Sequence, residues 1–237
     1  MRLLVTGAAG GIGAAVVRLA IEAGHDVLGH DLGWHAHPDG AETVAGDLTD
    51  PAHLAALAER AEDFGVDAVV ASHGIQGAGA LRDLDAARVR AILLVNAGTV
   101  PRLFAATRPA LARRQGRFVV TTSQAALRAE PDNSAYCAAK WAVQAWVAAQ
   151  AAIEGPTGVA VRALCPGRTE TPLLLRATEE VAAAQGMSVE AYTATVVDRI
   201  PLRRYATTRE TAAAALFLAE PGIRPAVLAN TGGEVPW

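Results

Sequence analysis

At residues 3–13 the chain reads Leu3-Leu4-Val5-Thr6-Gly7-Ala8-Ala9-Gly10-Gly11-Ile12-Gly13, and this stretch decides the fold. Its first residues have the apolar character of a buried strand, and the residues after Gly13 continue with helical periodicity. Glycines between the two permit a tight turn and let a pyrophosphate approach the backbone and the N-terminus of the helix. Glycines also serve plain strand-to-helix turns, but the flanking strand and helix favour a dinucleotide site.

The rest of the chain continues this alternation of apolar strand-like runs and amphipathic helical stretches. We expect strands over residues 3–6, 26–31, 43–45, 68–71, 117–122, 159–164 and 226–228, and helices near 11–23, 51–63, 83–114, 134–153 and 207–219. Such alternation predicts a doubly wound parallel sheet covered by helices on both faces, in one domain over 1–237. Pro101 and Pro109 predict a kink or a break in the helix over 83–114.

Composition limits the classes of partner. The net charge of -3 and the dispersed arginines exclude a polyanion-binding surface, so neither nucleic acid nor an anionic membrane is expected. Arg2 is followed at once by a strand-like run, and there is no run of about 18 apolar residues, so we expect neither a signal peptide nor a membrane span. The two cysteines, Cys137 and Cys165, form no disulfide framework, which agrees with a reducing, cytoplasmic location.

Lys140 is the only lysine among the 21 basic residues, and it lies four positions after Tyr136. Lysine is a compact point charge, whereas the guanidinium of arginine is planar and bulky, so position 140 looks like a place where arginine does not serve. Residues four apart share a face of a helix. The pair therefore predicts a tyrosine acid/base beside a cation, and an ordinary pair on the helix surface is the alternative.

Asp31 ends the second expected strand, 18 residues after Gly13. A carboxylate there can accept hydrogen bonds from an adenosine ribose, and its charge would repel a 2'-phosphate. No basic residue lies inside the glycine loop, and Leu32 follows the aspartate. These features predict NAD rather than NADP, with a solvated turn aspartate as the alternative.

Six short motifs occur in the same order and spacing as in a known family. The motifs are Thr6-Gly-x-x-x-Gly11-Ile12-Gly13, Asp47-Leu48, Asn96, Ser123, Tyr136-x-x-x-Lys140 and Pro166-Gly167. With these motifs the chain resembles the short-chain dehydrogenase/reductases from end to end. The resemblance implies a Rossmann domain with a seven-stranded parallel sheet, a substrate lid over residues 173–200, and a homotetramer or homodimer. The cofactor-binding residues that the loop, Asp31 and the resemblance indicate are Gly7, Gly11, Ile12, Gly13, Asp31, Asp47, Leu48, Gly74, Tyr136, Lys140, Pro166, Gly167 and Thr171.

The resemblance also assigns roles in catalysis. Asp47 would contact the adenine end of the cofactor and Thr171 its nicotinamide carboxamide, while Lys140 would bind the nicotinamide ribose. Tyr136 would exchange a proton with the substrate, with the nearby positive charge favouring its ionised form, and Ser123 would orient the substrate oxygen. Asn96 would help to hold a water chain that reaches Lys140. Ser123 and Asn96 also have plainer interpretations, as a strand-end serine and as an asparagine at a helix break.

Two histidine features depart from the pattern or invite another one. Where the family has Asn-Asn-Ala-Gly, this chain has Ala71-Ser72-His73-Gly74, so His73 either faces the cofactor or substrate or is packed or solvated, and we favour the second interpretation. His30, His35 and His37 lie close together in sequence. The His35-x-His37 pair, however, has no third ligand at a persuasive spacing, so no metal site is expected.

The substrate is the least constrained part of the prediction. Gln124, Arg168 and Tyr192 are the candidate substrate contacts, and the expected lid is rich in leucine. We favour a small polar secondary alcohol or its ketone, such as a polyol, sugar or hydroxy acid, over a steroid or terpenoid. A catalytically inactive NAD-binding sensor or scaffold would be marked by a damaged Ser-Tyr-Lys set, and here the set is complete.

Overall fold

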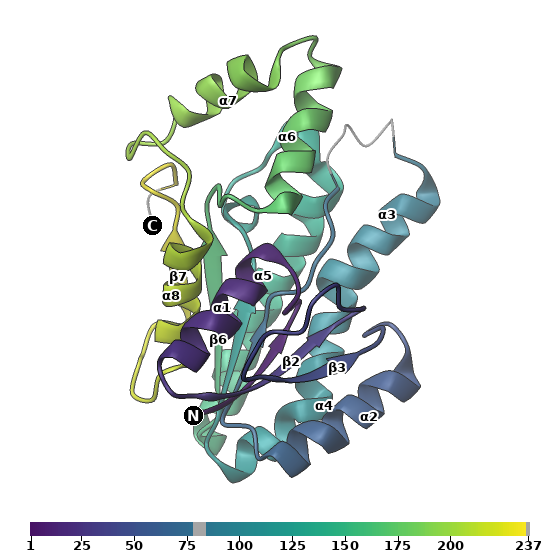
Figure 1. Cartoon of the computed structure of the whole chain (residues 1–237), viewed down its shortest axis with the longest axis vertical. Helices are drawn as coiled ribbons and strands as arrows, with labels where there is room; N and C mark the ends of the chain where they lie inside the picture. Colours follow the sequence, from purple (N-terminus) through teal and green to yellow (C-terminus); the bar gives the residue numbers. More distant parts are fainter. Residues whose placement is uncertain (78–83, 236–237) are drawn as a thin grey trace.

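A computed structural model describes residues 1–77 and 84–235 of the chain, and its centre is a parallel sheet of seven strands (Figure 1). The strand order is β3-β2-β1-β4-β5-β6-β7, so the order reverses between β1 and β4. This is the doubly wound Rossmann arrangement expected from the sequence. The strands are β1 (Arg2–Thr6), β2 (Asp26–Asp31), β3 (Glu42–Ala45), β4 (Ala68–Ala71), β5 (Arg117–Thr121), β6 (Ala160–Pro166) and β7 (Val227–Asn230).

Helices cover both faces of the sheet and complete three layers. On one face α1 (Gly11–Glu22) and α8 (Thr208–Ala219) bury alanine, valine and leucine against the sheet. On the other face α2 (Pro51–Phe64), α4 (Thr99–Arg113) and α5 (Ser134–Glu154) do the same. Because both faces are covered, the central strands β4 and β5 are buried at every position. β4 accordingly reads as a continuous apolar run, and β5 has three apolar residues between Arg117 and Thr121.

The helix expected over 83–114 is interrupted, but not at the prolines. It consists of α3 (Ala86–Leu93), a π-helical turn (Leu94–Gly98) and α4, and Pro109 lies inside α4 without ending it; residue 83 lies outside the described residues. In a π turn each N–H bonds one residue further back than in an α-helix, which leaves a carbonyl without its usual partner. The side-chain amide of Asn96, inside this turn, donates to the Ile92 carbonyl at 3.0 Å.

The same stretch, Ala86–Arg113, is the one place in the described residues that is long and apolar enough to cross a membrane, judged by length and composition alone. Leu103, Phe104 and Leu111 of this stretch are buried in the core against the sheet. Packing of α4 on the sheet accounts for the apolar character of these positions.

Residues 173–200 form two helices beyond the carboxyl ends of the strands, α6 (Pro172–Ala184) and α7 (Val189–Val197), at the top of Figure 1. Each begins at a hydroxyl cap: Thr171 accepts from the Leu174 N–H, and Ser188 accepts from the Ala191 N–H, both at 3.1 Å. Their place beside the strand ends is the one expected of a substrate lid, and that role stays a prediction. The remaining helical turns are η3 (Gln124–Ala126), η4 (Pro131–Asn133) and η5 (Gly155–Thr157).

Candidate active site

The loop between β1 and α1 requires glycine at three positions. Gly7 has a φ of +71°, and a Cβ there would lie 2.7 Å from the backbone nitrogen of His73. A Cβ on Gly13 would lie 2.1 Å from the Gly7 carbonyl oxygen, and one on Gly11 would lie 2.7 Å from Cγ2 of Thr171. Side chains at these positions would therefore force the loop, the end of β4 or the start of α6 apart.

This loop forms the wall of a crevice of about 820 Å³ at the point where the strand order reverses. The first N–H groups of α1 have no partner within the helix, and its N-cap residue Gly10 has no side chain to satisfy them. Free donors together with the positive end of the helix dipole suit a pyrophosphate, so the residues present fit a dinucleotide. The crevice is lined by predicted cofactor residues that include Gly7, Gly11, Ile12, Gly13, Asp31, Asp47, Leu48, Gly74 and Thr171.

Two carboxylates lie in the wall of this crevice. Asp31 accepts from the N–H groups of Ala9 in the glycine loop and of Leu32, both at 2.8 Å. Asp47 accepts from the Thr49 N–H at 2.8 Å, and the bonds from Thr49 lower the pKa of Asp47. Asp31 therefore bears its charge beside the glycine loop, as the cofactor prediction requires, and each carboxylate retains lone pairs for a ligand hydroxyl.

The predicted catalytic side chains lie together at the carboxyl ends of β4, β5 and β6. Tyr136 and Lys140 are one turn apart on α5, and the Lys140 ammonium nitrogen is 5.4 Å from the centre of the Tyr136 ring. Ser123 follows β5 and begins the turn η3. All three line a pocket of about 140 Å³, together with Pro166, Gly167 and Thr171. This pocket opens into the larger crevice, because Ile12, Ser72, His73, Gly74, Thr171 and Leu173 line both.

Asn96 belongs to the support of this pocket rather than to its lining. Its side-chain amide donates to the Ile75 carbonyl at 2.9 Å and its oxygen accepts from the Ile75 N–H at 3.1 Å. A Cβ on Gly74 would lie 2.6 Å from the Asn96 oxygen and 3.9 Å from the Lys140 nitrogen. Asn96 thus holds the segment after β4 in place, close to Lys140 but without a direct bond to it.

Burial dominates the electrostatics of the pair. Tyr136 and Lys140 are only 9% and 4% exposed. Burial raises the pKa of Tyr136, and the hydrogen bond with Ser123 lowers it by less. Burial likewise lowers the pKa of Lys140 from 10.5 to about 8. In the ligand-free protein the phenol therefore stays protonated, because desolvation opposes its charge. The expectation that Lys140 and the oxidised nicotinamide together favour ionised Tyr136 concerns the protein with its cofactor and stays a prediction.

His73 is packed and bonded at both ring nitrogens. Its Nδ1 lies 2.6 Å from the Thr6 hydroxyl and its Nε2 lies 2.8 Å from the Thr99 hydroxyl. Thr99 donates its hydroxyl proton to the Val95 carbonyl, so Nε2 must be the donor to Thr99 and Nδ1 the acceptor from Thr6. Burial lowers the pKa of His73 to about 3. His73 is thus a neutral, bonded histidine that ties β1 to α4, and because it also lines the catalytic pocket and the crevice, both interpretations left open by the sequence apply to it.

The predicted substrate residues are divided between two adjoining pockets. Gln124 and Arg168 line the pocket of Tyr136, whereas Tyr192 on α7 lines a second pocket beside it that Arg168 also reaches. Sequence reasoning missed Glu130 and Asn133, which line both pockets and precede Tyr136 in a loop without any motif. Their only signal is their place between Ser123 and Tyr136, at the carboxyl end of β5.

The other histidines pair with one another or with neighbours. His30 Nε2 lies 2.8 Å from His53 Nε2, and burial and His53 lower the pKa of His30 to about 4. His37 stacks on Trp34. Within residues 1–77 and 84–235, no group of three histidine, cysteine, aspartate or glutamate side chains could hold a metal ion.

Known proteins resemble the chain over nearly its whole length. It is 32% identical to the cis-4-hydroxycyclohexanecarboxylate dehydrogenase of Sinomonas cyclohexanicum, over 97% of this chain and 94% of the relative. It is 28% identical to the D-beta-hydroxybutyrate dehydrogenase of Cupriavidus necator, over 98% and 96%. A solved actinorhodin polyketide ketoreductase with NADPH superposes with a TM-score of 0.90 at 25% identity, over 100% of this chain and 97% of that one.

A family model described as enoyl-(acyl carrier protein) reductase matches residues 7–227, from the glycine loop to β7. The matching region contains both pockets, the crevice and every predicted catalytic residue. With this fold and these relatives, the chain belongs to the short-chain dehydrogenase/reductase family.

Proposed function

We propose that the protein is an NAD-dependent alcohol dehydrogenase or ketoreductase that interconverts a small polar secondary alcohol and its ketone. Relatives of this chain are named as dehydrogenases of D-beta-hydroxybutyrate and of cis-4-hydroxycyclohexanecarboxylate, and a solved ketoreductase of the same fold holds NADPH. The observation that carries the proposal is the convergence of Ser123, Tyr136 and Lys140 on one small pocket that opens into the dinucleotide crevice.

The chain's own groups support proton transfer at the substrate oxygen. When bound, a nicotinamide cofactor supplies the hydride acceptor or donor and, in its oxidised form, a positive charge. The protonated Tyr136 of the ligand-free protein is suited to donate a proton to a ketone oxygen, and in the reverse direction the phenolate accepts the hydroxyl proton. Lys140 is charged below its pKa of about 8, and its charge favours the phenolate. Ser123 orients the substrate oxygen by hydrogen bonding.

Asp31 supports NAD over NADP. Its carboxylate is bonded to Ala9 of the glycine loop and lines the crevice where the adenosine ribose is expected, so a 2'-phosphate there would meet a negative charge. The ketoreductase with NADPH shows that this fold also accepts the phosphorylated cofactor, so the preference has to be measured.

Unpaired acceptors in the catalytic pocket support a polar substrate. Gln124 and Asn133 line the catalytic pocket, and their side-chain oxygens are buried without a hydrogen-bond partner. If their amides turned toward the pocket, these oxygens could accept from hydroxyl groups of a polyol, sugar or hydroxy acid. The catalytic pocket is about 140 Å³ and the pocket beside it about 250 Å³, so the space next to Tyr136 lies at the low end of the usual ~300 to 1,000 Å³ of sites for drug-sized ligands. This favours a small substrate over a steroid or terpenoid.

A panel of secondary alcohols offered with NAD and with NADP tests the proposal. We expect NADH formation with at least one small polar alcohol and a much slower reaction with NADP. Binding of NADH without turnover of any alcohol or ketone would instead identify an inactive NAD-binding sensor, and preference for NADP would refute the role of Asp31.

A further inference from the structure

We propose that the substrate is a hydroxy acid whose carboxylate binds between Arg168 and Arg199. This inference deepens the proposed function, because it names the chemical class of the alcohol and the side chains that recognise it. It rests on the charges that line the second pocket.

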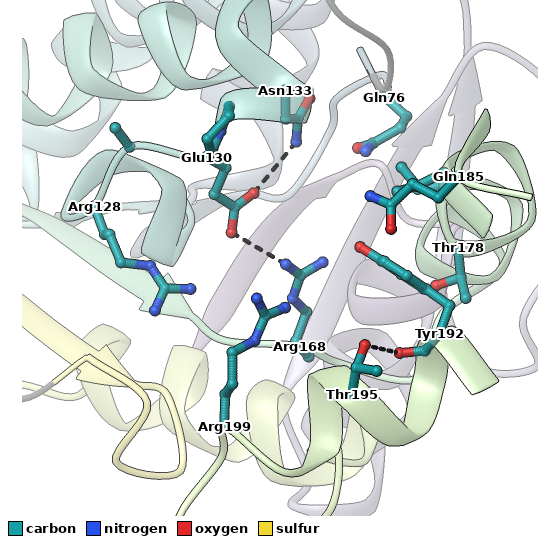
Figure 2. Close-up of a pocket in the computed structure, with 14 residues that line it drawn as sticks. Gln76, Arg128, Glu130, Asn133, Arg168, Thr178, Gln185, Tyr192, Thr195 and Arg199 are labelled. Carbon is teal, nitrogen blue, oxygen red and sulfur yellow. Dashed lines mark hydrogen bonds and ion pairs between the residues drawn. The ribbon is translucent and has the colours of Figure 1, made fainter. Parts of the chain in front are cut away.

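The second pocket has a volume of about 250 Å³ and lies between the sheet end and the helices α6 and α7. It adjoins the catalytic pocket, because Gln76, Glu130, Asn133, Arg168 and Ala177 line both. Figure 2 shows the side chains of Arg128, Arg168 and Arg199 around it, with Glu130 as the acidic group among the lining residues. The pocket therefore has an excess of positive charge.

Two of the three arginines have acidic partners. Arg128 donates to Glu234 at 2.6 Å, and the Glu234 side chain is only 1% exposed, so Glu234 balances the charge of Arg128. Arg168 makes one contact of 3.4 Å with Glu130, whose oxygens also accept from Gln124 and Asn133. A guanidinium has five N–H donors, so this single long contact leaves Arg168 largely available to another acceptor.

Arg199 has no such partner. Within the described part of the chain, no hydrogen bond or ion pair reaches its side chain, although it lines the same pocket as Arg168. Arg199 is exposed, and Glu130 is the single carboxylate among the described lining side chains, so Arg168, Arg199 and Glu130 together carry a net charge of +1. A ligand carboxylate would balance that charge, and the fork of a guanidinium matches a carboxylate in two parallel hydrogen bonds.

The layout of the two pockets sets the length of the molecule. Arg168 lines both pockets, so a hydroxyl group at Tyr136 and a carboxylate at Arg168 are separated by a short carbon chain. Ala177 and Val181 of α6 provide an apolar wall for that chain. Arg168 follows β6, whereas Arg199 follows α7, so the carboxylate would also join the sheet to the helices above it.

Binding of a carboxylate can be tested without knowing the substrate. With NADH saturating, we compare the rise in melting temperature caused by butyrate with that caused by butyramide, its neutral counterpart, at fixed ionic strength. We expect butyrate alone to stabilise the wild-type protein and to bind at least ~10-fold more weakly to Arg199→Gln, the loss expected for one charge-assisted hydrogen bond. The matched control is Arg203→Gln, because Arg203 is exposed, pairs with Asp198 and does not line the pocket.

Equal effects of butyrate and butyramide, or an unchanged effect of butyrate in Arg199→Gln, would overturn the inference. Turnover separates this failure from failure of the proposed function. If hydroxy acids are oxidised, kcat/KM for them should fall at least ~10-fold in Arg199→Gln. For the corresponding neutral diols kcat/KM should be the same in Arg199→Gln and in the wild-type protein. Oxidation of diols as fast as of hydroxy acids would reject the carboxylate site but keep the dehydrogenase, whereas oxidation of neither would reject the dehydrogenase.

Discussion

Replacing Lys140 with methionine should remove activity without reducing stability. Burial lowers the pKa of Lys140 from 10.5 to about 8, and the difference corresponds to about 3 kcal/mol of unfavourable free energy for the charged form. Its hydrogen bond to the Thr121 carbonyl, 3.1 Å long, offsets about 1.5 to 3 kcal/mol of this cost. Lys140→Met should therefore leave the free energy of unfolding at neutral pH unchanged or raise it by up to ~1.5 kcal/mol.

The pH dependence makes this prediction sharper. Because the pKa of Lys140 is lower in the folded protein, the unfolded chain binds more protons between about pH 8 and pH 10.5. The free-energy cost of burying charged Lys140 is therefore fully present below pH 8 and is lost as the pH rises toward 10.5. Over this window the free energy of unfolding of the wild-type protein should rise by up to ~3 kcal/mol relative to that of Lys140→Met.

Urea unfolding followed by tryptophan fluorescence at several pH values measures the difference. Trp146 packs against the core and reports on it. Parallel stability curves for the two proteins from neutral pH to about pH 10 would refute the argument, because they would mean that the buried ammonium is not desolvated. So would a loss of more than ~3 kcal/mol in Lys140→Met at neutral pH, the size expected when a buried pair is broken.

Three further predictions concern the crevice and its support. Gly13→Ala places a Cβ 2.1 Å from the Gly7 oxygen, so the glycine loop has to shift. Calorimetry should show NADH affinity at least ~10-fold lower, and the free energy of unfolding should fall by ~1 to 3 kcal/mol. Unchanged affinity would contradict binding of the cofactor at this loop. Asp31→Ser removes the charge that repels a 2'-phosphate, so kcat/KM with NADP relative to NAD should rise at least ~10-fold, and a constant ratio would exclude Asp31 from cofactor choice. Burial lowers the pKa of His73 from 6.5 to about 3, so the free energy of unfolding of the wild-type protein should fall on acidification below pH 6.5. In His73→Asn the slope of this free energy against pH should be smaller by ~1.4 kcal/mol per pH unit. Equal slopes would show that the pKa of His73 is the same in the folded and unfolded protein.

The parts of the fold that were predictable are those encoded locally. The glycine loop can be recognised because backbone contacts, such as that of Gly13 with Gly7, exclude every side chain. Tyr136 and Lys140 can be placed on one side of α5 because helical spacing alone determines it. A parallel sheet built from seven strands followed from alternation of apolar runs and helical stretches, since parallel strands are buried on both faces. The order of the strands in the sheet comes from the structure alone.

The parts that could not be predicted depend on contacts distant in sequence. The π turn around Asn96 is stabilised by bonds to Ile75, which lies 21 residues earlier, and no local periodicity reports such a contact. Arg168 and Arg199 share a pocket only because α6 and α7 pack together beside the segment that follows β6. The direction of the pKa shift of Tyr136 depends on the depth of its burial, which spacing does not reveal.

The central claim is that the Tyr136 hydroxyl exchanges the proton with the substrate oxygen beside a bound nicotinamide. The most direct measurement is the single-turnover rate of NADH formation in Tyr136→Phe, a substitution that keeps the ring and removes only the hydroxyl. The account predicts unchanged NADH affinity and a rate at least ~100-fold lower than in the wild-type protein, the scale of losing a positioned general acid/base. An unchanged rate would contradict it.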